Sequence, residues 1–239
     1  MKLDDVKKLH LKRYREEFGH FLVEGEHLVL ELQKAAVRNP LLQGCELYVT
    51  REYENWRGPF QIHLIGASHM SQVADTKNPQ GIVALVPLWP PAAARAGERA
   101  IYLHEIQDPG NLGTILRTLA WFGNFRCLLS PGSVDPYNPK VIRASAGAIF
   151  HVPIEVDVEL AALSTRFAHI AALDMTGESV QSAQFKESGC YVFGNEARGV
   201  PREQLTALGA QPYTIEGIGA IESLNVAAVV NMCVYELNR

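Results

Sequence analysis

The amino-acid sequence predicts an α/β protein in which a parallel sheet, covered by helices on both faces, follows a smaller α/β domain. Through the C-terminal part of the chain, apolar segments of strand length alternate with helical segments. This is the pattern of a parallel sheet that is buried on both faces. Apolar residues make up 47% of the 239 residues and charged residues 20%, as is ordinary for a globular protein with a sizeable core.

A break in the pattern divides the chain near residues 87–99. Its sequence, PLWPPAAARAGER, combines three prolines with small residues and has no apolar period. Such a composition is typical of a linker. We therefore expect an N-terminal domain over residues 1–86, a linker over 87–99 and a second domain over 100–239.

The first part begins with charged helical segments and continues into FLVEGEHLVLEL, residues 21–32. Short apolar runs follow at CELYVT (45–50), QIHLIG (61–66) and GIVALV (81–86). Strand-length runs interleaved with helical ones indicate a small α/β domain.

The second part gives a clearer pattern. We predict strands at residues 100–106, 125–130, 169–174 and 190–194, with helices between them. One helix carries Leu112, Ile115, Leu116 and Leu119 on a single face and stops at Gly123. The last helix is expected to start near Ser223 and has a broad apolar face formed by Val226, Val229, Val230, Cys233, Val234 and Leu237.

Several classes of protein are disfavoured by composition. No apolar stretch is long enough to cross a membrane, and the charged N-terminus lacks the apolar core of a signal peptide, so we expect a cytoplasmic protein. The four cysteines stand among apolar neighbours, and neither they nor the eight histidines have ligand spacing. We therefore expect core cysteines and no metal site.

The net charge of −4 does not by itself suggest a nucleic-acid partner. However, residues 1–20 contain six lysines and arginines against four acids: Lys2, Lys7, Lys8, Lys12, Arg13 and Arg15. A local basic patch can bind phosphates even on an acidic protein. The alternative is a solvated amphipathic helix.

Three loops at the predicted carboxyl ends of strands combine glycines with polar residues at the start of helices. They cover residues 108–118 (DPGNLGTILRT), 193–199 (FGNEARG) and 215–226 (IEGIGAIESLNV). Ligands of open parallel sheets bind at this edge. Taken singly the residues have ordinary explanations: Asn111 and Ser223 as N-caps, Arg117 as a solvated side chain, and Glu196 as an acid at a helix entrance.

Other nucleotide sites are not supported by these loops. The glycines at 217 and 219 do not form a full G-x-G-x-x-G pattern after a first strand, and the sequence has no Walker loop. An ordinary nucleotide-dependent enzyme acting on a small molecule is therefore disfavoured.

Taken together, the three loops resemble the signature motifs of the SpoU/TrmH family of RNA 2′-O-ribose methyltransferases. These read Asp108-Pro-Gly-Asn-Leu-Gly-x-x-x-Arg-Thr, Gly194-Asn-Glu-x-x-Gly and Gly219-x-x-x-Ser-Leu-Asn-Val, in the family's order. The segment beginning Arg143-Ala-Ser-Ala-Gly is similar to one between the first two motifs, and Phe21-Leu-Val-Glu-Gly-Glu to the family's small substrate-binding domain. The resemblance covers residues 8–86 and 100–237.

The resemblance implies a fold, a cofactor and partners. The fold is that of the SPOUT class, a parallel α/β sheet with a C-terminal trefoil knot, after a ribosomal-protein-like RNA-binding domain. The implied cofactor is S-adenosylmethionine, and the implied assembly is a homodimer. The substrate is a structured RNA, with ribosomal RNA favoured over transfer RNA.

The resemblance also assigns roles to residues. It identifies Arg117 as the catalytic arginine, together with the motif residues Asn111, Glu196, Ser223 and Asn225. Gly194, Ile215, Gly217 and Leu224 fall where the family holds its cofactor. Because a guanidinium stays protonated in proteins, we expect Arg117 to bind phosphate and stabilise a developing 2′-oxyanion. Whether it also accepts the proton is left open.

One residue departs from the family pattern, and two alternatives remain. Glu216 stands where the third motif usually has a proline, which places an acid beside the expected cofactor loop. The alternatives are an RNA-binding protein of the same fold without catalysis, and a methyltransferase that acts on a base. The Ser-Leu-Asn motif favours ribose, and the presence of all the polar motif residues favours catalysis. Neither the RNA nor the nucleotide is identified by the sequence.

Overall fold

The computed structural model describes residues 1–195, 197–221 and 223–239. The chain forms two compact units. The first contains residues 1–90 together with 135–151, and the second contains residues 91–134 and 152–239. The segment 135–151, which the sequence places within the second domain, thus packs with the first.

The first unit is built on a four-stranded mixed sheet. The strand order is β1-β4-β2-β3, in which β4 is antiparallel to both of its neighbours and β2 is parallel to β3. The strands are β1 (His20–Glu24), β2 (Glu46–Val49), β3 (Gln61–Leu64) and β4 (Ile82–Pro87). The helices are α1 (Leu3–Val6), α2 (Lys12–Phe18), α3 (Glu26–Ala36), α4 (Ala67–Val73) and α6 (Pro139–Ser145).

The segment 135–151 is fixed within the first unit by charged, aromatic and close backbone contacts. The buried guanidinium of Arg15, only 4% exposed, is paired with Asp135. The ring of Tyr137 packs against Phe21 with 4.9 Å between ring centroids. A side chain at position 147 would overlap Glu31 of α3, since an added Cβ would lie 2.7 Å from the Cβ of that residue. The glycine there permits the close approach.

The second unit contains a six-stranded sheet in the order β10-β8-β9-β5-β6-β7, with all neighbours parallel. The strands are β5 (Arg99–Leu103), β6 (Phe125–Leu129), β7 (Ile154–Glu155), β8 (Ile170–Ser179), β9 (Cys190–Phe193) and β10 (Gln211–Thr214). The helices are α5 (Pro109–Phe122), α7 (Leu163–Arg166), α8 (Ala183–Lys186), α9 (Arg202–Leu208) and α10 (Val226–Leu237).

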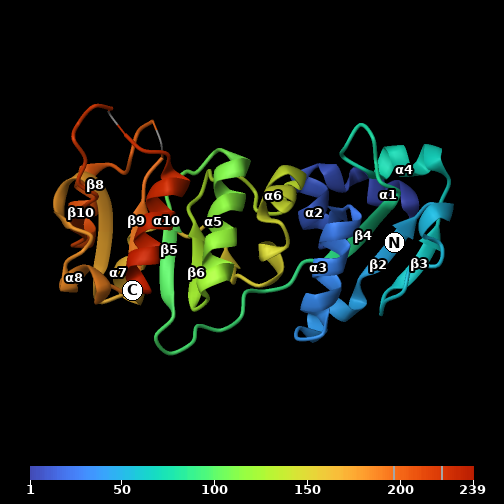
Figure 1. The fold of residues 1–239 in the computed structure, drawn as a ribbon, viewed down its shortest axis with the longest axis horizontal. Helices are drawn as coiled ribbons and strands as arrows, with labels where there is room; N and C mark the ends of the chain where they lie inside the picture. Colours follow the sequence, from blue (N-terminus) through green and yellow to red (C-terminus); the bar gives the residue numbers. More distant parts are fainter. Residues whose placement is uncertain (196, 222) are drawn as a thin grey trace. The chain divides into compact units, whose positions relative to one another are not determined.

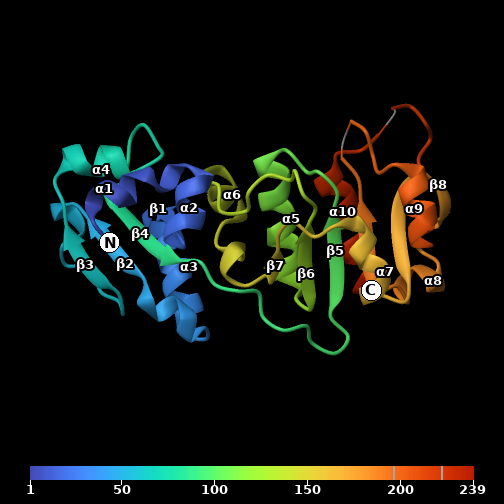
Figure 2. The same ribbon diagram turned by 180° about the vertical axis from the view of Figure 1, so that it is seen from behind.

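Helices cover both faces of this sheet. Helices α5 and α10 lie side by side on the face turned toward the viewer in Figure 1. Figure 2 shows α7 and α9 on the opposite face, where they pack on an apolar core that includes Tyr102, Leu128 and Val192. Strands β6 and β9 are buried along their whole length, and β5 is buried except at its first residue, Arg99. The expected α/β fold with a parallel sheet is confirmed.

The elements agree with the sequence patterns except at weak signals. The strands expected near residues 100, 125, 170 and 190 are present, and α5 ends at Gly123 as predicted. The last helix begins two residues later than expected, because Asn225 and not Ser223 is its N-cap. Strands β7 and β10 had no clear sequence signal.

The cysteines are buried and unpaired, and burial raises the pKa of each thiol to about 12. Within the described part of the chain, no helix is long and apolar enough to span a membrane.

Candidate active site at the carboxyl end of the parallel sheet

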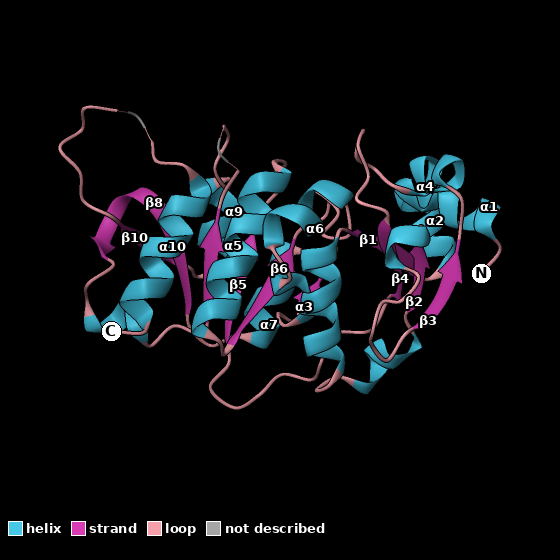
Figure 3. Cartoon of the chain, turned by 45° about the vertical axis from the view of Figure 1, so that its right-hand side comes forward, coloured by secondary structure: helices cyan, strands magenta, loops and turns pink. Residues whose placement is uncertain are grey.

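The three motif loops emerge from the same edge of the six-stranded sheet. Strand β5 lies between β9 and β6, so the chain order reverses there and the loops after β5 and β9 are neighbours. Such a reversal opens a crevice at the carboxyl ends of the strands, where ligands of open α/β sheets bind. Figure 3 shows the loops after β9 and β10 rising from this same end.

The first motif forms the start of helix α5. Asp108 is the N-cap, and its carboxylate accepts a hydrogen bond from the backbone N–H of Asn111 at 2.8 Å. Pro109 occupies the first turn, where a missing N–H costs nothing. The N-cap interpretation of Asn111 is therefore wrong, because Asp108 caps the helix and Asn111 lies within its first turn. Arg117, two turns further along, is exposed, as its position off the apolar stripe predicts.

Helix α10 brings the end of the third motif to the first. The side chain of Asn225 caps α10 by accepting from the N–H groups of Ala227 and Ala228. Its Nδ2 donates to Oδ1 of Asn111 at 3.0 Å. The two helices run in the same direction, since Thr118 also donates to Asn231 at 2.6 Å. Two of the predicted site residues, Asn111 and Asn225, are thus in direct contact although 114 positions separate them.

The second motif folds into a tight turn after β9. Asn195 forms a bridge with Gly199, whose N–H donates to the Asn195 carbonyl at 2.8 Å. Gly194 is required there, because an added Cβ would lie 2.5 Å from the Gly199 carbonyl carbon. Glu196, a predicted site residue, lies outside the described residues.

The third motif loop is open to solvent. Gly217 and Leu224 are exposed, Ile215 is half-buried, and Ile218 is 99% exposed. A Cβ added at Gly217 would meet no atom within 4 Å. Ser223 is exposed and does not cap α10, so its N-cap interpretation is wrong. The described residues of this stretch therefore present exposed apolar side chains and an unobstructed Gly217 to solvent.

Sequence reasoning missed three residues at this edge. Asn195 is buried and donates to the Glu105 carbonyl at 2.8 Å. Glu105 pairs with Arg198 at 2.6 Å and has a positive φ of 49°. Nδ1 of His104 is buried and has no hydrogen-bond partner among the described residues, and burial lowers the pKa of this imidazole. His104 and Glu105 fell within the predicted strand 100–106, whereas β5 ends earlier than predicted, at Leu103. Asn195 stood in the second motif without an assigned role.

The family of the chain follows from a match to known proteins. Residues 98–235 match the model of the SpoU rRNA Methylase family. The chain belongs to this family. Residues 2–84 match an MRM3-like substrate binding domain, which is the accessory domain that this member of the SpoU family carries before its methylase part.

Individual SpoU relatives resemble the chain over nearly its whole length. The 23S rRNA (guanosine(2553)-2′-O)-methyltransferase RlmP of Bacillus subtilis is 32% identical, with 99% of this chain and 95% of RlmP covered. A structure described as an RNA methyltransferase of the TrmH family, from Porphyromonas gingivalis, superposes with a TM-score of 0.84 at 27% identity, covering 98% of this chain and 96% of that one. AviRb of Streptomyces viridochromogenes, solved in complex with AdoMet, shares the fold with a TM-score of 0.81 at 19% identity, covering 99% and 96%.

The basic residues at the N-terminus of this SpoU protein are largely engaged within the chain. Arg15 is buried against Asp135 and is not part of a surface patch. Lys7 and Lys8 pair with nearby aspartates on their own helical turn. Lys12 pairs with Glu16, one helical turn away. The expected basic patch is therefore weaker than its composition suggests.

Proposed function

We propose that the protein transfers a methyl group from S-adenosylmethionine to a ribose 2′-hydroxyl of ribosomal RNA. The observation that carries the proposal is the meeting of all three SpoU motifs at the carboxyl edge of one parallel sheet, with Asn225 of the third bonded to Asn111 of the first. The similarity to RlmP over the whole chain favours ribosomal RNA as the substrate.

The loops of the second and third motifs suit a cofactor of this kind. The cofactor supplies a methyl group that is already activated on a sulfonium. Its adenine needs apolar contacts and backbone hydrogen bonds, both of which loop 215–225 offers through exposed apolar side chains and an unobstructed Gly217. We assign Gly194, Ile215, Gly217 and Leu224 to this role.

Arg117 is assigned to the oxygen that reacts. When the bond between the 2′-oxygen and the methyl carbon forms, the bond from carbon to sulfur breaks and the hydroxyl proton leaves. Negative charge develops on the oxygen in the transition state, and a positioned guanidinium stabilises it. Arg117 can take this role because it is exposed and has no partner among the described residues. It also suits the neighbouring RNA phosphate, which it can bind through two N–H groups.

The other polar motif residues are assigned to orientation. The hydrogen bond between Asn111 and Asn225 fixes the starts of α5 and α10 relative to each other. Asn111 thereby holds the helix that carries Arg117. We assign Glu196, with Asn111, to the orientation of Arg117 and the ribose, and Ser223, with Asn225, to the wall of the methyl-transfer pocket.

We further propose a homodimer and a trefoil knot in the second unit. Exposed apolar side chains on α5 and α10 support a dimer through this face: Trp121, Met232 and Tyr235. Trp121 is 85% exposed, and large exposed apolar residues mark interaction surfaces. For the knot, the support is that the chain returns from edge strand β10 to pack α10 on α5.

We assign target selection to the N-terminal domain, residues 1–86, and methyl transfer to residues 100–239, with 87–99 as the linker. The match of residues 2–84 to a substrate binding domain supports this division. A substrate in the ribosome agrees with the cytoplasmic location expected from the sequence.

The test is methyl transfer from labelled S-adenosylmethionine to ribosomal RNA that lacks modifications, followed by nuclease digestion and nucleoside analysis. The proposal predicts label in a single 2′-O-methylnucleoside. Label on a base would contradict the ribose assignment. Cofactor binding without transfer to ribosomal or transfer RNA would favour an RNA-binding protein without catalysis.

A further inference from the structure

We propose that Glu105 is a positioning residue that holds the turn after β9 in the form that the cofactor site requires. The inference rests on the proposed function for its consequences in catalysis, while its structural part stands independently. Glu105 lies just beyond the end of β5, in the loop that leads to α5, and the turn at residues 195–199 follows the neighbouring strand.

Glu105 contacts three loops through three different groups. Its N–H donates to the Ser130 hydroxyl at 2.7 Å, after β6. Its carbonyl accepts from Nδ2 of Asn195 at 2.8 Å and, within its own loop, from Gln107 at 3.3 Å. Its carboxylate accepts from Arg198 at 2.6 Å. Two of these contacts hold the turn after β9 at both of its sides.

The backbone of Glu105 adopts a conformation that is unfavourable for a glutamate. Its φ of 49° lies in the left-handed region, which is uncommon for residues other than glycine and asparagine. Such conformations persist where the surroundings fix them, and they concentrate at functional sites. With this left-handed backbone, the Glu105 carbonyl accepts from Asn195 and its carboxylate pairs with Arg198.

The turn that Glu105 holds depends on Asn195. The Oδ1 of this buried side chain accepts from the N–H groups of Ala197 and Arg198 at 2.9 and 3.2 Å. The same side chain donates to the Glu105 carbonyl. The turn also lies against Gly194, which is assigned to the cofactor. A displaced Glu105 would therefore alter the cofactor site.

The ion pair itself contributes little to global stability. The side chain of Arg198 is 70% exposed and that of Glu105 36%. Exposed pairs are screened by water and stabilise a protein weakly. Removing the carboxylate should therefore leave the protein folded, so that local effects on the turn can be measured.

The experiment measures hydrogen exchange at the amides of residues 197–199 without cofactor or RNA, in Glu105→Gln, Arg198→Gln and the double variant. Because each single change removes the same pair, each should speed exchange about two- to fivefold, and the double variant should add nothing further. The exchanged pair Glu105→Arg with Arg198→Glu should restore slow exchange. Lys186→Gln, which breaks a pair with Glu236 elsewhere in this unit, is the matched control and should change nothing.

Kinetics then connect the turn to the cofactor. We expect Glu105→Gln to raise KM for S-adenosylmethionine about two- to fivefold and to leave KM for RNA unchanged. Glu105→Asn, which tolerates the left-handed backbone but is too short to reach Arg198, should behave in the same way. Unaltered exchange in Glu105→Gln, or a rise in KM for RNA alone, would overturn the inference. A wild-type protein that transfers no methyl group would instead overturn the proposed function, and the exchange result would still decide the role of Glu105.

Discussion

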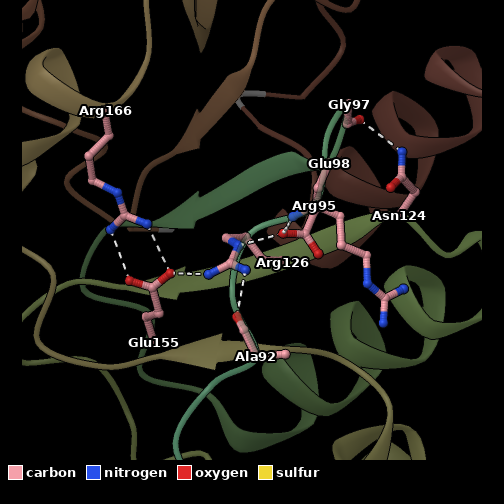
Figure 4. Close-up of polar contacts among 8 residues, drawn as sticks. All are labelled: Ala92, Arg95, Gly97, Glu98, Asn124, Arg126, Glu155 and Arg166. Atoms are coloured by element: carbon pink, nitrogen blue, oxygen red, sulfur yellow. Dashed lines mark hydrogen bonds and ion pairs between the residues drawn. The ribbon is translucent and has the colours of Figure 1, made fainter.

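Two arginines of the second unit lie in opposite environments. Arg117 lies two turns into helix α5, is exposed, and has no partner among the described residues. Arg126 lies on β6 toward the amino edge, and its side chain is 7% exposed. Figure 4 shows it between Glu98 and Glu155, with a further bond to the carbonyl of Ala92.

Arg126 has a structural role, whereas the role proposed for Arg117 is in the reaction. The guanidinium of Arg126 uses its donors on carboxylates and a carbonyl, and Arg166 completes the network by a forked contact with Glu155. A buried arginine of this kind fixes the linker residues Ala92 and Glu98 to the sheet. Arg117 has no partner among the described residues, which agrees with its proposed role in binding a phosphate or an oxyanion. The paired guanidinium of Arg126 stabilises the fold, whereas that of Arg117 is proposed to act in the reaction.

The largest effect on stability is expected from Arg126→Met. It leaves the carboxylate of Glu98, 4% exposed, without its partner, and breaking one half of a buried ion pair costs about 3–5 kcal/mol. Urea denaturation measures the loss. The control is Arg166→Gln, which removes a more exposed partner of Glu155 and should cost under about 1 kcal/mol. Equal losses in both variants would show that the buried network is not what stabilises this edge.

A smaller loss of stability is expected at Asn225, where two substitutions distinguish helix capping from methyl transfer. Asn225→Ala removes the N-cap of α10 and should lower the free energy of unfolding by about 0.5–2 kcal/mol. Asn225→Asp keeps the oxygen that caps α10 but loses the Nδ2 donor to Asn111. We expect the Asp variant to unfold like the wild type and to lose methyl transfer. If the Asp variant were fully active, the contact with Asn111 would have no part in catalysis.

The smallest effect is a pH dependence at Glu155. Burial alone would raise the pKa of this carboxyl, but hydrogen bonds from Arg166 and Arg126 outweigh it and lower the pKa below its ordinary value of 4.5. The folded state then binds fewer protons than the unfolded state, so this stabilisation is present above about pH 4.5 and is lost as the pH falls through the lowered value. Urea midpoints measured from about pH 7 to below pH 4 should fall less steeply in Arg126→Met. A steeper fall in the variant would contradict the assignment.

The sequence was informative where a local pattern decides the structure. The apolar spacing from Leu112 to Leu119 predicts α5 and its end at Gly123, and it correctly leaves Arg117 on the exposed side. Strand β10 was missed because it lies at the sheet edge, contains Pro212 and buries only Tyr213. A strand with one buried side chain has no alternating pattern to detect.

Contacts between distant positions could not be predicted. Nothing near Arg15 in the sequence indicates that Asp135, 120 positions away, neutralises it. The sequence likewise suggested Ser223 as the N-cap of the last helix, whereas in the structure Asn225 caps α10. The motifs predict a site at the carboxyl edge of the sheet, but the proposed role of Glu105 depends on a left-handed backbone that no pattern of side chains specifies for a glutamate.

The most direct test of the account compares Arg117→Ala with Arg126→Met in the same preparation of RNA. We expect Arg117→Ala to unfold at the wild-type urea concentration and to lose about 10²–10³-fold in the rate of 2′-O-methyl formation. Arg126→Met should show the reverse: a large loss of stability, and near wild-type transfer under conditions where it remains folded. An Arg117→Ala variant that transfers methyl groups at the wild-type rate would contradict the central claim that Arg117 stabilises the reacting oxygen.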